Sequence, residues 1–197
     1  MRPTATLLLL ALAAWLAAVA ATGTAAMAAF GALPRLGISV AGTEALFGGD
    51  TAEMGRYAAG RMMGPVFMTG DWIQFTTSAL AVGCTVRLVR LGGFRGPRWA
   101  RGLLCAAVGS AAALLAWRAW SAPAMNADLL AYWHAVEAGE REAASAAKGA
   151  FDAAHRVADT LFRVQGATVA AALAMLPMAL LEATVPTTRR HAGTGHG

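Results

Sequence analysis

The stretch RLVRLGGFRGPRWARG, Arg87 to Gly102, holds five arginines and no acidic residue, although long apolar segments flank it on both sides. The five are Arg87, Arg90, Arg95, Arg98 and Arg101. Positive charge between two apolar segments is typical of a cytoplasmic loop of a membrane protein, because lysine and arginine accumulate in the loops on that side of the bilayer. The class of the protein therefore depends on whether the flanking segments can cross a membrane.

The composition supports a lipid environment. Of the 197 residues, 57% are hydrophobic and only 14% are charged, whereas a soluble domain carries roughly 25% charged residues. A soluble fold of this size cannot remove so much apolar surface from water. The formal charge of +5 would suit nucleic acid only if the basic residues formed one face of a soluble domain. They lie between apolar runs instead, so we expect no nucleic-acid partner.

The segments on either side of the arginine-rich stretch have the properties of membrane spans. Residues 62–86 carry one charge, Asp71, and residues 102–120 form a short apolar run that begins just after Trp99 and contains Trp117. In a helix these two tryptophans lie about 27 Å apart, close to the thickness of the hydrocarbon core. Aromatic residues gather at both membrane interfaces. We predict spans over about 62–86 and 102–120.

Two further spans are predicted at the ends of the chain. Residues 5–33 contain no charge, are long enough to cross the bilayer and end before Pro34. Their beginning also resembles a signal peptide, and cleavage stays an alternative, although the apolar run exceeds the usual length of about 7–15 residues. The last span is predicted over about 160–185, where Pro177 is tolerated because neighbouring helices can compensate for it.

A segment before the last span is too polar to cross the membrane but has helical features. Over about 124–158 it contains no proline, and Leu129, Trp133 and Val136 form an apolar stripe at helical spacing. We predict an extracytoplasmic helical segment, continuous with or hinged to the last span. Two acid-first pairs at i,i+4 spacing support it: Asp152/Arg156 and Asp159/Arg163.

The predicted fold class is an all-α integral membrane bundle of four transmembrane helices, forming one domain over 1–186. The glycine-rich tail, 187–197, is predicted to be a disordered cytoplasmic tail. Four spans place the N-terminus, the arginine-rich stretch and the C-terminus on one side, with eight basic residues and one nearby acid; the other side has eight basic and nine acidic residues. This asymmetry predicts a multi-pass protein of a bacterial inner membrane with both ends cytoplasmic.

The arginine-rich stretch then faces the cytoplasmic leaflet, which carries anionic headgroups. Each arginine near that surface contributes about 1 kcal/mol of attraction. We therefore expect the lipid bilayer itself to be a partner, contacted through Arg87, Arg90, Arg95, Arg98 and Arg101. A second copy of the chain, or another membrane protein, is left open as a further partner.

Asp71 is the strongest candidate for a functional residue. An acid within a span costs roughly 2.5–3.5 kcal/mol on insertion scales and usually faces the bundle interior or a cavity. Gln74 and Ser78 share its helix face and complete a candidate intramembrane polar site. From its depth in the outer half of the span, we predict that Asp71 pairs with Arg163, with His155 lying further out.

Two interpretations of this polar site stay open. In the first, Asp71 has a structural role only: it forms a packing salt bridge, or it lies close enough to the membrane interface to be hydrated. In the second, the site is a small polar pocket or a proton or ion relay near the outer leaflet. No Ser/His/Asp arrangement, phosphate loop or paired-carboxylate motif is present, so we expect no enzymatic activity. We also expect no cofactor and no metal, because His134 and His155 lie outside or beside the spans and Cys84 and Cys105 are isolated. The expected function is a scaffold or accessory protein acting through helix contacts; a small transporter or channel around Asp71 is the alternative.

The chain resembles a family of small four-span membrane proteins of unknown function, the bacterial relatives of the eukaryotic transmembrane protein 205 group. The features that carry the resemblance are AAFGALPRLGI after the first span and FDAAHRVADTLFRVQGATVAAALAML leading into the last one. In that family a histidine lies near the start of the last span, and His155 takes that place here. The resemblance implies a four-helix membrane bundle and implies no activity.

Overall fold

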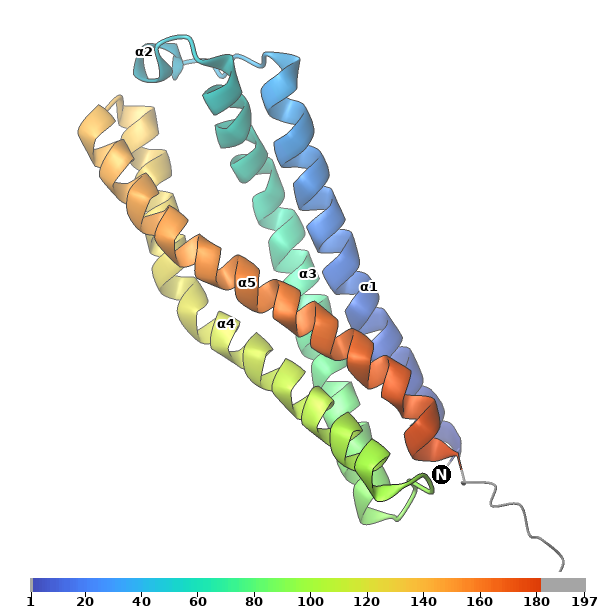
Figure 1. Ribbon diagram of the computed structural model, residues 1–197. Helices are drawn as coiled ribbons and strands as arrows, with labels where there is room; N and C mark the ends of the chain where they lie inside the picture. Colours follow the sequence, from blue (N-terminus) through green and yellow to red (C-terminus); the bar gives the residue numbers. More distant parts are fainter. Residues whose placement is uncertain (1, 182–197) are drawn as a thin grey trace, which may run out of the picture.

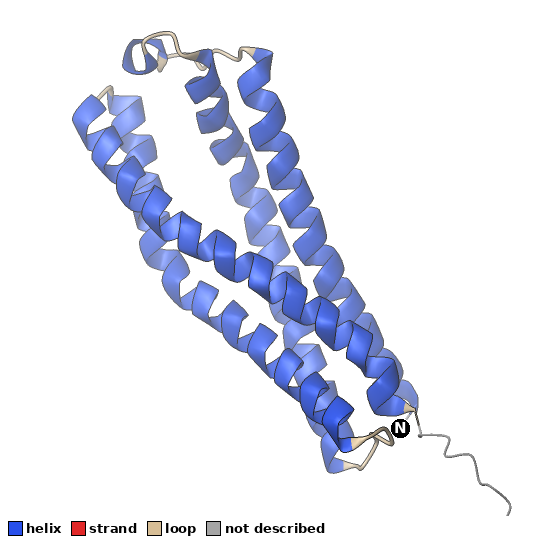
Figure 2. Ribbon diagram, in the orientation of Figure 1, coloured by secondary structure: helices blue, strands red, loops and turns tan. Residues whose placement is uncertain are grey.

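The computed structural model describes residues 2–181, which are almost entirely helical (Figure 2). The predicted disordered tail, 187–197, and the last residues of the predicted fourth span lie outside the described residues. The elements are α1 (Arg2–Ala32), the short 3-10 helix η1 (Leu33–Leu36), α2 (Glu44–Phe47), α3 (Thr51–Arg90), α4 (Arg98–Ala138) and α5 (Arg141–Leu180).

The four long helices form two antiparallel hairpins (Figure 1). One hairpin pairs α1 with α3, and the other pairs α4 with α5; α1 also packs on α5, and α3 on α4. The start of α1, the connection 91–97 and the end of α5 lie together at one end, which we call the arginine end. The short helix α2 and the turn between α4 and α5 lie at the opposite end, the cap end.

Local signals in the sequence explain where the helices begin and end. Asp50 caps α3, because its Oδ1 accepts hydrogen bonds from the backbone N–H groups of Ala52 (2.9 Å) and Glu53 (3.0 Å). Pro34 falls in the short helix that follows α1, as predicted for the end of the first apolar run. Gly139 ends α4 in the left-handed region, with φ of 74°, a conformation that glycine adopts at no steric cost.

The long helices exceed the thickness of a membrane. α3, α4 and α5 have 40, 41 and 40 residues, which gives each of them a length of about 60 Å against a hydrocarbon core of about 30 Å. Among the described residues, three helical segments are long and apolar enough to cross a membrane: Arg2–Leu36, Arg98–Ala138 and Arg141–Leu180. The segment predicted as the second span lies within α3, which carries Asp71, Gln74 and several hydroxyl residues in its middle.

The predicted helical segment 124–158 is helical, but its division differs from the prediction. It is the end of α4 and the beginning of α5, which turn back on each other at Gly139. The alanine-rich sequence on both sides of Gly139 favours helix, so helix propensity alone does not predict this turn. Leu129 and Trp133 pack against the buried Val136 in one cluster, as the predicted stripe requires.

Of the two predicted ion pairs in this region, one is present and one is wrong. Arg163 lies 2.7 Å from Asp159, at the predicted spacing of one helical turn. Asp152 instead accepts a hydrogen bond from Lys148 (3.0 Å), one turn before it, and not from Arg156. A helical acid can reach a basic residue four positions before it or four positions after it, so sequence spacing alone does not select between the two.

Buried apolar residues form two separate cores. The long core fills the space between all four helices towards the arginine end; its largest fully buried side chains include Leu12, Trp15 and Leu104. The cap core, around Tyr57, Tyr132 and Val136, joins α3 to the tip of the α4–α5 hairpin. Both cores take residues from both hairpins, so each contributes to holding the hairpins together.

The outer surface of the bundle is also apolar. Large hydrophobic side chains point away from the cores, among them Leu10 (57% exposed), Trp72 (69%) and Trp117 (61%). Large contiguous apolar patches are rare on soluble monomers and mark protein or membrane contacts. The pattern fits helices whose outward faces lie against lipid.

Candidate functional site

Four polar side chains from three helices meet between the two cores. Arg118 of α4 donates from Nη2 to Asp71 Oδ1 of α3 at 3.0 Å, and from Nη1 to Gln165 Oε1 of α5 at 3.0 Å. Gln165 Nε2 donates to Gln74 Oε1 at 2.8 Å. Gln74 Nε2 lies 3.5 Å from Asp71 Oδ1 and closes the circuit. We call these four residues the polar ring.

The chemistry of the four groups fixes the direction of the hydrogen bonds. A guanidinium can only donate and an ionised carboxylate can only accept. Gln165 must therefore turn its oxygen to Arg118 and its NH₂ to Gln74, which in turn faces Asp71 with its own NH₂. The circuit begins on the positive member and ends on the negative one, so the charges of Arg118 and Asp71 compensate each other.

The ring is buried on its glutamine side and more open on its charged side. Gln74 and Gln165 are fully buried, while the side chains of Arg118 and Asp71 keep 17% and 39% of their exposure. The Arg118 guanidinium also lies over the Phe162 ring, 4.9 Å from its centroid, a favourable cation–π position. Buried polar groups that satisfy one another in this way avoid the cost of unpaired donors in an apolar interior.

Two glycines bring α1 close to the ring. A Cβ atom added at Gly70, next to Asp71, would collide with Thr22 Oγ1 of α1. A Cβ atom at Gly166, next to Gln165, would lie 3.0 Å from a methyl carbon of Val19, also on α1. Small residues allow helices in membranes to approach closely. Helix α1 contributes no side chain to the ring but packs tightly beside it.

The structure brings together only part of the predicted polar site. Asp71 and Gln74 belong to the ring, and Ser78 is buried one turn further along α3. The predicted pairing of Asp71 with Arg163 is wrong, because Arg118 pairs with Asp71 and Arg163 pairs with Asp159. Arg163 precedes Gln165 by two residues, which is about 200° around the helix, so it points away from the bundle. Its side chain is 78% exposed.

His155 is also separate from the ring. It is exposed and stacks on Phe151, with ring centroids 5.2 Å apart. It lies almost three helical turns from Gln165, towards the cap end. Within residues 2–181, no three His, Cys, Asp or Glu side chains come together as a metal site would require.

Sequence reasoning missed Arg118 and Gln165, although their depth could have identified them. Arg118 is 17 residues from Arg101 on α4, and Asp71 is 16 residues from Arg87 on α3; along a helix these separations are about 25 and 24 Å. Gln165 is 16 residues before Leu181. Measured from the arginine end, all three therefore reach the same level.

The arginine end collects positive charge from five arginines. Arg87, Arg90, Arg95 and Arg98 are exposed, and Arg101 is half-buried. Along the chain, Asp71 is the acid closest to this connection. The connection is held in place by the buried Phe94 and by a hydrogen bond from Gly96 N–H to Ala179 O (3.0 Å).

The cap end holds charges of both signs, and they join the hairpins. Arg61 of α3 donates to Glu137 of α4 at 2.9 Å and lies 4.8 Å from the centroid of the Trp133 ring. Beside this pair, Tyr57 and Tyr132 meet edge to face, with ring centroids 6.1 Å apart. Burial, followed by the negative charge of Glu53, raises the pKa of Tyr132 to about 12.

No family model, curated protein or solved structure gives a match to this chain. The polar ring is therefore interpreted from its own geometry. It can join the two hairpins through one partly buried ion pair, Arg118 with Asp71, and one buried amide contact, Gln165 with Gln74. It contains no histidine, thiol or second carboxylate to carry out acid–base or nucleophilic chemistry.

Proposed function

We propose that the chain is a four-span membrane protein in which α3 crosses the bilayer together with α1, α4 and α5. Its arginine end faces the cytoplasm, and both termini lie on that side. In this proposal the chain is similar to the small four-span family named above. It acts as a scaffold or accessory protein through contacts between helices, and it is not an enzyme.

The pairing of the ring supports a membrane position for α3. An unpaired Asp71 would make crossing costly, but Arg118 compensates its charge and Gln74 is buried against Gln165. Of the polar residues of α3 in the predicted span, Gln74, Ser78 and Thr85 are buried in the bundle. Its lipid-facing side keeps Trp72, Ile73 and Leu80, each at least 43% exposed.

The distribution of charge supports the orientation. The ring lies about 24 Å from Arg87 along α3, near the outer edge of a hydrocarbon core of about 30 Å. Beyond it, α5 is rich in residues of both charges and α4 carries the acids Asp128 and Glu137, while the arginine end carries only positive charge among the described residues. This is the asymmetry that orients bacterial membrane proteins, and it suits contact of the arginines with anionic headgroups.

One observation carries the scaffold assignment: the charged and amide groups of the ring pair with one another through hydrogen bonds. Asp71, the residue that a transporter would need for an ion or a proton, already pairs with Arg118 at 3.0 Å. A cleft at the cap end is lined by none of the four ring residues. A ring that satisfies itself suits a structural junction, and the apolar outer faces remain for partners.

Photocrosslinking in native membranes tests the scaffold assignment. A photoreactive amino acid at Leu10, which is 57% exposed on α1, should give discrete protein adducts. The same amino acid at the fully buried Leu8 is the matched control and should give none beyond adducts within the chain. If Leu10, Trp72 and Trp117 all gave lipid adducts only, the scaffold assignment would fail.

Reporter fusions test the topology. Fusions after Gly93 and Gly197 should report the cytoplasm, and fusions after Gly48 and Gly139 the outside. If α3 did not cross, Gly48 and Gly93 would report the same side. A cleaved first segment, the alternative left open by the sequence, would place the mature N-terminus outside and leave three spans.

A small transporter or channel is the second candidate, favoured by the 39% exposure that the Asp71 side chain retains. Proteoliposomes with an imposed proton or potassium gradient separate the two. The scaffold assignment predicts the same leak as empty liposomes. A flux that depends on the wild-type chain and disappears in Asp71→Asn would favour the transporter.

A further inference from the structure

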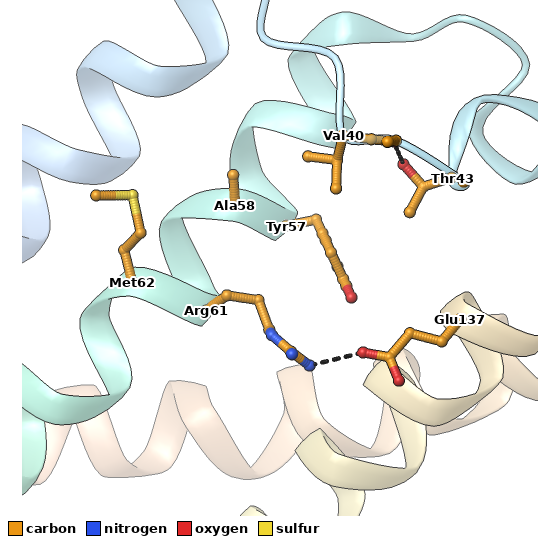
Figure 3. Close-up of a pocket in the computed structure, with 9 residues that line it drawn as sticks. Val40, Thr43, Tyr57, Ala58, Arg61, Met62 and Glu137 are labelled. Carbon is orange, nitrogen blue, oxygen red and sulfur yellow. Dashed lines mark hydrogen bonds and ion pairs between the residues drawn. The ribbon is translucent and has the colours of Figure 1, made fainter.

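A cleft of about 420 Å³ opens at the cap end, between the connection that follows α1, the first turns of α3 and the end of α4 (Figure 3). Tyr57 and Arg61 of α3 and Glu137 of α4 point towards the same space. Val40, Ala58 and Met62 give the cleft an apolar wall. A cleft of this size with a few converging polar groups is typical of a small-ligand site.

The cleft presents one charge of each sign, and both keep capacity for a ligand. Glu137 Oε1 accepts a hydrogen bond from Arg61 Nη1 at 2.9 Å, and the two side chains are 49% and 46% exposed. This is the hydrogen bond that the structure gives the Arg61 guanidinium, which has five N–H donors. The other oxygen, Glu137 Oε2, lies 3.9 Å from His134 Nδ1 on the surface.

This arrangement favours a ligand that carries both charges. The positive and negative charges of the lining balance, so a net anion or a net cation gains attraction from one residue and repulsion from the other. A zwitterion gains from both, with its anion on the free edge of the guanidinium and its ammonium on the carboxylate. Charge-assisted hydrogen bonds of this kind are the stronger ones in proteins.

The cleft lies at the depth of the outer headgroups. Arg61 is 26 residues from Arg87 on α3, about 39 Å along the helix, and about 37 Å across the membrane at a typical tilt of about 20°. That places it just beyond a hydrocarbon core of about 30 Å. Met62 (65% exposed) and Val66 (39%) follow towards the membrane centre and offer an apolar surface for acyl chains.

We infer that this cleft binds the headgroup of a zwitterionic phospholipid with a primary ammonium, a phosphoethanolamine lipid, in the outer leaflet. The phosphate contacts Arg61, and the ammonium donates to Glu137. The inference rests on the proposed four-span placement for the depth of the cleft. The chemistry of the headgroup rests only on the residues that line it.

Native mass spectrometry of the full chain in detergent tests the inference with three lipids of identical acyl chains, carrying phosphoethanolamine, phosphocholine or phosphoglycerol headgroups. The phosphoethanolamine lipid should be retained at concentrations at least about fivefold lower than the other two. Choline has no N–H to donate, and phosphoglycerol has no cation. Equal retention of the three lipids would overturn the inference.

Variants separate the two contacts. Glu137→Gln should remove the preference for phosphoethanolamine over phosphocholine, while Arg61→Gln should weaken both by about tenfold, the loss expected from one charge-assisted hydrogen bond. Arg61→Lys, which keeps the charge, should lie between. Arg56→Gln is the matched control, because Arg56 pairs with Glu53 on its own helix. If the control lost as much as Arg61→Gln, net charge alone would explain binding and the cleft would be excluded.

A soluble headgroup distinguishes the headgroup from the lipid chains. Glycerophosphoethanolamine in excess should displace the bound phosphoethanolamine lipid. If the lipid stayed bound, acyl chains would carry the affinity and the headgroup assignment would be wrong. These outcomes do not depend on topology, so reporter fusions that confirm four spans, combined with no headgroup preference, would overturn this inference alone.

Discussion

The polar ring and the cap end join the same two hairpins through the same kind of contact. In the ring, Arg118 and Asp71 lie 3.0 Å apart; at the cap, Arg61 and Glu137 lie 2.9 Å apart. The surroundings differ: the ring pair keeps 17% and 39% side-chain exposure and adjoins fully buried amides, whereas the cap pair keeps 46% and 49%. Because water screens charge, equal distances do not give equal energies.

The two junctions also differ in redundancy. The cap has several further contacts between the hairpins, including Lys148 near Glu53 (3.8 Å), Arg141 donating to Ala45 O (3.2 Å), and the edge-to-face tyrosines. In the ring, each residue uses its partners' donors and acceptors in a single closed circuit. Loss of one member should therefore disturb the ring far more than the cap.

The largest effect is expected for Arg118→Gln. This change leaves the Asp71 charge without its partner inside the bundle, and it should lower the free energy of unfolding by roughly 2–4 kcal/mol, somewhat less than the loss of 3–5 kcal/mol typical of a fully buried pair. Asp71 is partly exposed, which explains the lower range. Unfolding in mixed detergent micelles measures it. Arg163→Gln is the control: its pair with Asp159 lies on the surface, and it should cost under about 1 kcal/mol.

A smaller effect is expected for Gln165→Leu. It removes the acceptor of Arg118 Nη1 and the donor to Gln74 Oε1 at a fully buried position. Unpaired buried groups of this kind cost about 1–3 kcal/mol. The same unfolding experiment measures the loss. Thr168→Val serves as the control, because Thr168 is half-buried and its hydroxyl donates to Val164 O of its own helix. If both variants had equal stability, the amide contacts would not contribute to the junction.

The cap pair should matter least at neutral pH. Arg61→Gln, measured by the same unfolding experiment, should cost under about 1 kcal/mol, and the cost should shrink further at high salt. The other cap contacts remain, and the Arg61 side chain is already 46% exposed. A loss as large as that of Arg118→Gln would show that exposure does not separate the two junctions.

The cap core also predicts a loss of stability at high pH that leaves the stability at neutral pH unchanged. Burial raises the pKa of Tyr132 from 10.0 to about 12, so the folded chain holds this proton more tightly than the unfolded chain. The stability from the neutral phenol is complete below pH 10 and falls between about pH 10 and 12. The chain has two tyrosines, so Tyr57→Phe leaves Tyr132 alone, and its absorbance titration should be centred near 12. A midpoint near 10 would mean that the cap core is open to water.

The length and spacing of apolar segments made the all-α bundle predictable. Proline predicted the end of the first helix near Pro34. The isolation of Asp71 in an apolar run predicted that this residue belongs to a polar site. The division of 124–158 into two helices did not follow, because alanine-rich sequence surrounds Gly139 and propensity alone extends the helix through it.

The partner of Asp71 shows a second limit. In the sequence, Arg118 lies between Trp117 and Trp120 at the end of an apolar run, and Gln165 lies in the uncharged stretch 164–181. Neither position by itself indicates a partner for Asp71. Pairing across helices depends on rotation about each helix axis as well as on depth. Depth along the helices makes Arg118 and Gln165 candidates, but it makes Arg163 a candidate as well. The rotation of α5 turns Arg163 away from the bundle, and this rotation is known only from the packing of the four helices.

The central claim is that Asp71 and Arg118 form a structural pair that joins the two hairpins, and a double-mutant cycle tests it most directly. Unfolding of Asp71→Asn, Arg118→Gln and the double variant would be measured in the same mixed micelles. A lone buried charge is worse than none, so each single change should destabilise the chain strongly and the double change should recover part of the loss, with a coupling of at least about 1 kcal/mol. Losses that add, with no coupling, would contradict the claim and leave the ring without a role in joining the hairpins.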